Sequence, residues 1–160
     1  MRWRLSHRFD PAALPLANRH YNRQTPDSPQ FAPPGRCIVL VADRAVWVTS
    51  WPYYAQHRWV GAWINTLFRK ECGGLASEFI LEAIAATRFF WSPPALGIVT
   101  FVAPDAIRHK RDPGRCYRRA GFLVDGVTEV RRRLALRLTP EAMPKPEPPL
   151  GATLPLFPCP

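Results

Sequence analysis

Apolar residues first gather in two short runs separated by a polar turn. Residues 37–41 are continuously apolar, residues 42–44 form a plausible turn, and residues 45–49 are rich in β-formers. Two such runs around a tight turn are typical of a β-hairpin. Pro52 follows the second run, and residues 59–68, which interleave tryptophan with aliphatic side chains, predict a third strand.

The next segment changes from the hydrophobic period of a strand to that of a helix. From Leu75 to Thr87 apolar residues recur every three or four positions, which places them on one helical face. Pro93 and Pro94 end this helix, and residues 96–102 predict another strand. A strand, a helix and a strand make a βαβ unit, whose right-handed crossover requires a parallel strand pair.

Beyond this unit the pattern predicts a short helix and two more strands. A helical segment begins near Asp112 and ends at Arg119, and Gly121 suits the turn that follows a helix C-terminus. Strands are expected at residues 122–127 and 134–138. We therefore predict a single α/β domain with a mixed, partly parallel central sheet flanked by helices.

Proline usage divides the chain into three parts. A length of 160 residues suits one domain, and the 19 prolines, about twice average usage, gather outside its centre. Residues 1–34 are expected to be a basic, proline-punctuated arm, partly docked through its aromatic residues. Residues 35–138 form the domain, and residues 139–160 a proline-rich tail that lacks the backbone donors for a helix.

The chain shows no membrane or secretion signal. No segment has the ~18 apolar residues that a membrane span needs, and the N-terminus lacks the apolar core of a signal peptide. The four cysteines are scattered, without a Cys-x-x-Cys pair. We expect a cytoplasmic protein with reduced thiols, although an even number of cysteines leaves disulfides open.

Charge narrows the class of partner. The formal net charge is +10 and the pI is near 10.3. Because basic side chains that neutralise phosphates release counterions, nucleic acid is the first candidate, and an arginine content set by genome composition is the alternative. The expected nucleic-acid surface is a basic run: Arg108, Lys110, Arg111, Arg115, Arg118 and Arg119.

A basic glycine turn precedes the predicted helix. Backbone N–H groups at a helix N-terminus form an anion site, and glycines let the backbone approach a ligand. We predict that Arg69, Gly73, Gly74 and Ser77 bind a phosphate or pyrophosphate. The alternatives are an ordinary tight turn, a solvated arginine and a serine that satisfies the helix terminus.

The order of these elements resembles the N-acetyltransferase-like (GNAT) superfamily, in which the turn before the central helix cradles the pyrophosphate of coenzyme A. Here the first glycine after Arg69 is displaced by one residue from the usual spacing. Within the superfamily, about residues 18–138 are similar to the phage Mom proteins. The matching segments are His20-Tyr21, Leu67-Phe68-Arg69, Ala76-Ser77, Val99-Thr100-Phe101-Val102 and Pro113-Gly114-Arg115-Cys116-Tyr117.

The Mom resemblance implies an activity that composition does not show. It implies transfer of a small carbonyl-containing group to the N6 amine of adenine in double-stranded DNA, which protects phage DNA from restriction. It also implies a coenzyme A derivative as cofactor, iron with His20 as one ligand, and the bacterial host cytoplasm as the location of a phage-encoded protein.

Five residues are candidates for catalysis. The imidazole of His20 can accept or relay a proton near neutral pH, and the phenol of Tyr21 can donate one. Asp105 and Asp112 are acids on the loop after the 96–102 strand, and the resemblance implies that Tyr117 faces the acyl-carrier cleft. The alternatives are a structural histidine, aspartates that cap a turn or helix, and a packing tyrosine.

Two other functions fit the same fold and charge. A general GNAT N-acyltransferase would act on a small amine or a protein, and a non-enzymatic DNA-binding protein would use the basic run alone. An enzyme that attacks a paired base must turn it out of the duplex, where exposed aromatic side chains can stack on it. A homodimer would suit two-fold target sites.

Overall fold

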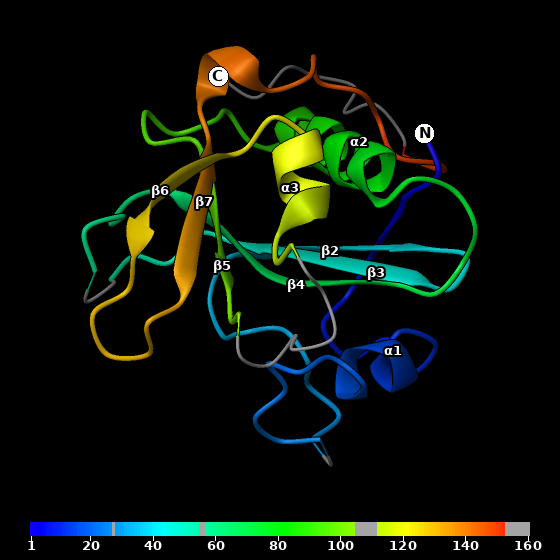
Figure 1. The fold of residues 1–160 in the computed structure, drawn as a ribbon. Helices are drawn as coiled ribbons and strands as arrows, with labels where there is room; N and C mark the ends of the chain where they lie inside the picture. The colour runs from blue at the N-terminus through cyan, green and yellow to red at the C-terminus, as the bar shows by residue number, and fades with distance from the viewer. Residues whose placement is uncertain (27, 55–56, 105–111, 153–160) are drawn as a thin grey trace.

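Seven strands form one sheet, and their spatial order departs from chain order at the last two strands (Figure 1). In the computed structural model the order is β1-β2-β3-β4-β5-β7-β6, with β4 and β5 parallel and the other neighbours antiparallel. The structure describes residues 1–152 except 27, 55–56 and 105–111. The strands are β1 (Arg4–Ser6), β2 (Cys37–Ala42), β3 (Ala45–Ser50), β4 (Trp63–Lys70), β5 (Ile98–Val102), β6 (Leu123–Val127) and β7 (Leu134–Leu138).

Local periodicity predicted most of these elements correctly. β2 and β3 form the expected hairpin, and β4, helix α2 (Ala76–Phe90) and β5 form the expected βαβ unit with its parallel pair. The short helix α3 (Arg115–Arg119) ends before Gly121, whose φ of 92° is in the left-handed region. The prediction of an α/β domain with a partly parallel sheet is confirmed.

The strand predicted at residues 59–68 was placed too early. Residues 59–62 form a turn, in which the N–H of Ala62 donates to the carbonyl of Trp59 (3.2 Å), and β4 begins at Trp63. Trp59 is buried against Phe101, with ring centroids 5.3 Å apart. A turn that tertiary contacts bury has the apolar composition of a strand, so the pattern did not separate the two.

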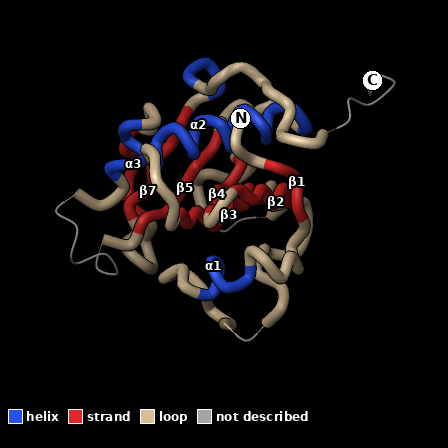
Figure 2. Tube along the Cα trace, turned by 90° about the vertical axis from the view of Figure 1, so that its right-hand side faces the viewer, coloured by secondary structure: helices blue, strands red, loops and turns tan. Residues whose placement is uncertain are grey.

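Helices cover both faces of the sheet (Figure 2). α2 and α3 lie on one face and α1 (Leu14–Asn18) lies on the other. Side chains of a strand alternate between faces, so Leu40 and Trp47 join the core under α2, whereas Val39 and Val48 join the core beside α1. Burial on both faces explains why the hairpin runs are continuously apolar.

The N-terminal residues are integrated into the sheet and its core. β1 pairs with β2 from Arg4↔Val41 to Ser6↔Val39. The preceding residue, Trp3, is fully buried, and its indole N–H donates to the carbonyl of Phe79 on α2 (2.8 Å). The start of the chain therefore belongs to the same packing unit as residues 35–138.

The C-terminal residues that the structure describes also pack on the domain. After the short 3-10 helix η2 (Pro140–Ala142), Met143 is buried in the α2 core. The N–H of Glu147 donates to the carbonyl of Ala85 (3.1 Å), and the N–H of Leu150 donates to the carbonyl of Trp3 (2.7 Å). Residues 139–152 thus run along α2 to the N-terminal strand.

The described residues contain neither a membrane-spanning helix nor a disulfide. In the part of the chain that the structure describes, no helix combines the length and apolarity needed to cross a membrane. No disulfide joins Cys37, Cys72 or Cys116, while Cys159 lies outside the described residues.

Candidate functional site

The parallel strands β4 and β5 separate halfway along β4. Their pairing runs from Trp63↔Ile98 to Asn65↔Thr100, after which β4 continues beside β3 to Lys70. A β-bulge marks the separation, because β3 pairs with Asn65 and then with Leu67, and Thr66 is the extra residue. A bulge bends its strand, and here the bend opens a wedge between β4 and β5.

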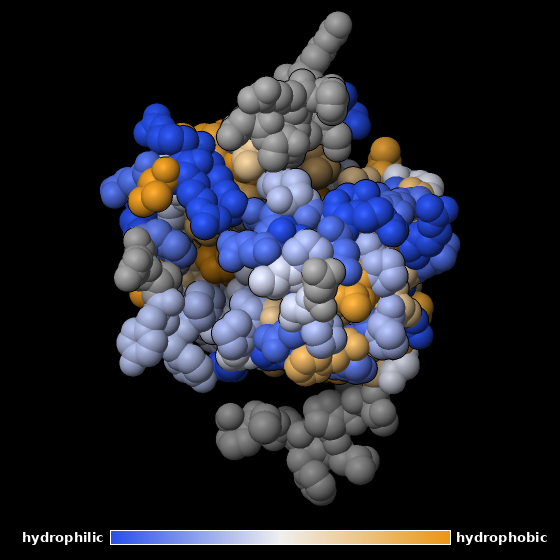
Figure 3. All heavy atoms as spheres, turned by 90° about the horizontal axis from the view of Figure 1, so that it is seen from below, coloured by the Kyte–Doolittle hydropathy of each residue, from blue (hydrophilic) through white to orange (hydrophobic). Residues whose placement is uncertain are grey.

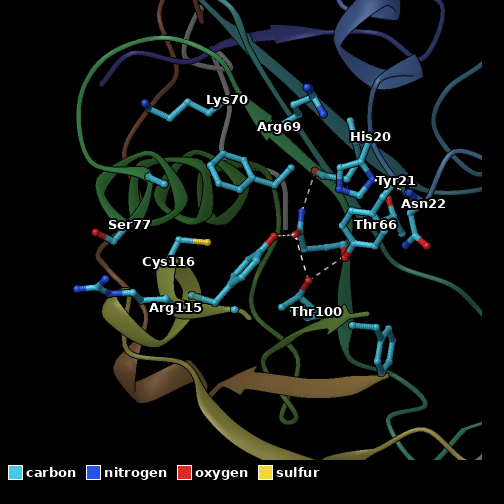
Figure 4. A pocket seen from close by; sticks show the side chains of 18 of the residues that line it. His20, Tyr21, Asn22, Thr66, Arg69, Lys70, Ser77, Thr100, Arg115 and Cys116 are labelled. Atoms are coloured by element: carbon cyan, nitrogen blue, oxygen red, sulfur yellow. Dashed lines mark hydrogen bonds between the residues drawn. The ribbon is translucent and has the colours of Figure 1, made fainter. Parts of the chain in front are cut away.

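A cavity of about 870 Å³ occupies this wedge (Figure 4). Residues 19–22 line it from the face that carries α1, and the first turn of α2 together with α3 lines it from the opposite face. Figure 4 shows His20 and Tyr21 on one side and Ser77, Arg115 and Cys116 on the other. The cavity therefore passes through the sheet at the fork.

A buried polar network holds the fork. The Tyr117 hydroxyl donates to Oδ1 of Asn65 (2.6 Å), and Thr100 Oγ1 lies 3.4 Å from the same oxygen. Nδ2 of Asn65 donates to the carbonyls of Val48 and Leu67 (3.0 Å each), on either side of the bulge. Burial raises the pKa of Tyr117 well above its ordinary value, so this phenol stays protonated and donates to Asn65.

His20 faces the cavity as a neutral ring. Burial, together with the positive charges of Arg69 and Arg133, lowers its pKa to about 4. The backbone N–H of Asn22 donates to His20 Nδ1 (3.2 Å). Since Nδ1 accepts that bond, the proton of the neutral imidazole lies on Nε2, and the ring offers a hydrogen-bond donor there.

Tyr21 stacks on His20, with ring centroids 4.5 Å apart and 29° between the planes. Burial raises the pKa of the Tyr21 phenol, so it is protonated at neutral pH. The residue as a whole is still 43% exposed, which leaves it accessible from solvent at the mouth of the cavity. The pair thus supplies two neutral donors side by side.

Glu71 fastens the segment that carries this pair to β4. Its carboxylate accepts two bonds from Arg19 (2.9 and 2.8 Å) and one from Arg69 Nε (2.6 Å), while Nη1 of Arg69 donates to the Arg19 carbonyl. Hydrogen bonds from Arg19 and then Arg69 lower the pKa of Glu71 to about 2. Residue 19 immediately precedes His20, so this cluster positions the histidine.

The Glu71 cluster gives a pH-dependent prediction. A carboxyl with a depressed folded pKa stabilises the fold above its ordinary pKa of 4.5, and that contribution is lost as pH falls toward about 2. Wild type should therefore resist urea better than Glu71→Gln near neutral pH, and the difference should shrink between about 4.5 and 2. Urea unfolding of both proteins across this range measures it, and a difference that is constant with pH would contradict the assignment.

The opposite end of the cavity suits an anion. α2 begins after Leu75, and no side chain in the described structure caps its N-terminus, so first-turn N–H groups are open to a ligand. Lys70, Ser77 and Arg115 line this end. Lys70 donates to the Cys72 carbonyl and lies 5.1 Å from the ring centroid of Phe79, on the α2 side of the sheet.

The structure brings together many, though not all, of the residues selected from the sequence. Gly73 and Gly74, which precede α2, do not line the cavity. Arg118 on α3 does not line it either and forms an ion pair with Asp112. Asp105, Arg108, Lys110 and Arg111 lie outside the described residues. The selected residues that line the cavity are His20, Tyr21, Arg69, Ser77, Asp112, Arg115, Tyr117 and Arg119.

Arg69 occupies a different place from the expected one. It is the penultimate residue of β4 and points to the arm, where it binds Glu71 and Arg19, rather than to the N-terminus of α2. The neighbouring Lys70 has the position expected for Arg69. Adjacent residues of a strand face opposite sides of the sheet, so Lys70, and not Arg69, is on the same side as the N-terminus of α2.

Sequence reasoning missed the fork itself. Asn65, Thr66 and Thr100 line the cavity, but none of them was selected as a site residue from the sequence. Two consecutive polar residues inside the apolar run 63–68 were the available signal, because buried polar side chains in a strand need partners and accompany bulges.

The described residues do not supply a metal site around His20. They contain no group of three or more His, Cys, Asp or Glu side chains that could hold a metal ion. The iron implied by the resemblance therefore has no set of protein ligands among the described residues.

Comparison with known proteins adds no family assignment. No protein-family model matches the chain, and no match was found among curated proteins or solved structures.

Proposed function

We propose that this protein is a GNAT-type, Mom-like transferase that adds a small carbonyl-containing group to the N6 amine of adenine in double-stranded DNA. The observation that supports it most strongly is the cavity through the β4–β5 fork. One end has an uncapped helix N-terminus with cations, and the other has the neutral His20–Tyr21 pair. A donor and an acceptor that enter from opposite faces would meet at the fork.

The residues at the α2 end fit a coenzyme A derivative. Lys70 and Arg115 would pair with its phosphates, and Ser77 with the first-turn N–H groups of α2 would bind the pyrophosphate. Thr66 Oγ1 is buried and has no hydrogen-bond partner among the described residues, although Thr66 lines the cavity. Such an atom can bind a ligand group. The derivative would supply a carbonyl carbon activated as a thioester.

His20 is suited to polarise that carbonyl. A neutral imidazole with its proton on Nε2 donates a hydrogen bond and gains strength as negative charge grows on the carbonyl oxygen. A pKa of about 4 keeps the ring neutral at working pH. In this proposal His20 is an electrophilic donor, instead of the proton acceptor suggested by the sequence.

Tyr21 would balance the protons of the reaction. In the proposed reaction a bond would form between adenine N6 and the carbonyl carbon, and the carbon–sulfur bond would break with its electron pair on sulfur. The Tyr21 phenol would pass its proton to the departing sulfur and take the proton that N6 loses, so it would end unchanged. The raised pKa keeps the phenol protonated for this relay.

The charge around the cavity supports a nucleic-acid acceptor. Among the described lining residues, Arg19, Arg69, Lys70, Arg115 and Arg119 are cationic and Asp112 is the one carboxylate. A cavity of about 870 Å³ lies within the range of ligand pockets, ~300–1,000 Å³. A turned-out base therefore has both an electrostatic guide and room to enter.

Mass spectrometry of nucleosides tests the proposal directly. Plasmid DNA would be digested after expression of wild type, of a His20→Ala, Tyr21→Ala variant, and of a His7→Ala, Tyr54→Ala control. The control removes the same two residue types at exposed positions away from the cavity. A heavier deoxyadenosine is expected with wild type and control but not with the cavity variant.

Two other outcomes would replace this function. Unmodified nucleosides together with saturable coenzyme A binding would favour a general GNAT N-acyltransferase, since the α2 end does not depend on the acceptor. Unmodified nucleosides with tight DNA binding that the cavity variant retains would favour a non-enzymatic DNA-binding protein.

A further inference from the structure

A basic turn projects from the sheet beside the cavity. Residues 128–133, here named the arginine hairpin, connect β6 to β7 and include Arg131, Arg132 and Arg133. Arg131 and Arg132 are exposed, and Val130 is 94% exposed, which shows how far the tip extends. This turn is separate from the basic run at residues 108–119, which the sequence predicts as the nucleic-acid surface.

The arginine hairpin has a defined conformation. The N–H of Thr128 donates to the carbonyl of Arg133, and the N–H of Arg133 donates to Oγ1 of Thr128 (2.9 Å each). Arg132 adopts φ 49°, in the left-handed region used by tight turns. Since the turn is closed at its base, its two exposed guanidinium groups project from a fixed position and a ligand need not order the backbone.

Strand register places the hairpin near the end of the cavity that carries His20 and Tyr21. Leu134, which follows it, pairs with Val102 on β5, and Val102 lines the cavity. Arg133 is also near the catalytic pair, because its positive charge lowers the pKa of His20 and opposes the rise in the pKa of Tyr21. The face seen from the α1 side is mainly hydrophilic, as polar binding requires (Figure 3).

The arginines of the hairpin are available for an anion. Within the described residues, neither Arg131 nor Arg132 forms an ion pair, in contrast to Arg19, Arg69 and Arg118. Glu129 offsets one of the three positive charges of the turn. Exposed guanidinium groups lose little on binding phosphate and can bind it in a bidentate manner.

We propose that the arginine hairpin grips the phosphate backbone of duplex DNA next to the target base, with Arg131 and Arg132 as phosphate contacts. This rests on the proposed DNA-directed function. Its position beyond the end of β5 would hold the backbone while the base enters the cavity beside His20 and Tyr21. The contacts are to phosphate, so they orient the duplex and do not read its sequence.

Salt dependence of binding tests the two contacts. Each lost phosphate contact lowers the slope of log affinity against log salt by about 0.9 for duplex DNA, so Arg131→Ala, Arg132→Ala should lower it by about 1.8. The matched control is Arg4→Ala, Lys145→Ala, which removes two exposed charges that form no ion pair in the described structure. Fluorescence anisotropy with a short labelled DNA duplex would measure wild type and both variants.

The outcomes separate this inference from the proposed function. A reduced slope for the hairpin variant and an unchanged slope for the control support the arginine hairpin, even where wild type yields no modified adenine and the proposed function fails. Equal slopes for wild type and the hairpin variant overturn it, even where modified adenine is found. The inference is also overturned if wild type does not bind duplex DNA. It is overturned as well if the hairpin variant has a lower slope with duplex RNA but not with duplex DNA.

Discussion

Replacing His20 with alanine is expected to reduce the rate of adenine modification by about 10²–10³-fold, the usual effect of removing one donor to a developing oxyanion. The Nε2–H of a neutral ring is lost, while Tyr21 and the α2 end remain. Single-turnover rates on a DNA duplex, with modified nucleoside quantified by mass spectrometry, would measure the loss. His7→Ala, which changes an exposed histidine outside the cavity, should leave the rate unchanged.

A conservative variant distinguishes the donor role from that of a base. In His20→Gln the side-chain amide places an N–H near the position of imidazole Nε2, so this variant should be markedly faster than His20→Ala. A proton acceptor would not be restored in this way. The kcat/KM of wild type, which reports on the free enzyme, should show no inflection near pH 6.5, because the pKa of His20 is about 4. An inflection near 6.5 with an inactive glutamine variant would contradict the donor role.

Replacing Trp3 with alanine is expected to lower the free energy of unfolding by ~3–5 kcal/mol, the range for deleting a large aromatic side chain from a core. The indole is fully buried, packs edge-on against Phe79 at 5.7 Å between centroids, and donates to the carbonyl of that residue. Alanine would leave a cavity under α2 and remove the hydrogen bond that the indole donates to Phe79. Denaturant unfolding monitored by circular dichroism would give the difference.

The same measurement tests whether the N-terminal residues belong to the folded core. Tyr54→Ala removes a ring that is 94% exposed, so its effect should stay within about 0.5 kcal/mol. An equally small effect of Trp3→Ala would mean that β1 is only loosely attached. The segment that carries His20 follows β1 along the chain, so the attachment of β1 to the sheet also affects the geometry of the cavity.

The sequence by itself determined the elements whose pattern is local. The hairpin, the long helix α2 and the parallel strand pair follow from hydrophobic periods and proline positions, because these reflect which face of an element is buried. The His20–Tyr21 pair and Ser77 could also be selected in advance, since their chemistry is visible in the residue type.

Tertiary structure alone decided how these pieces form a site. The bulge at Thr66 depends on pairing with β3, and it opens the fork and directs Arg69 to the arm and Lys70 to α2. The tautomer of His20 depends on one bond from Asn22, and its pKa on burial between elements distant in sequence. A one-residue change of register reverses the face of every later side chain in a strand, and burial is a property of the packed chain, so neither could be read from local pattern.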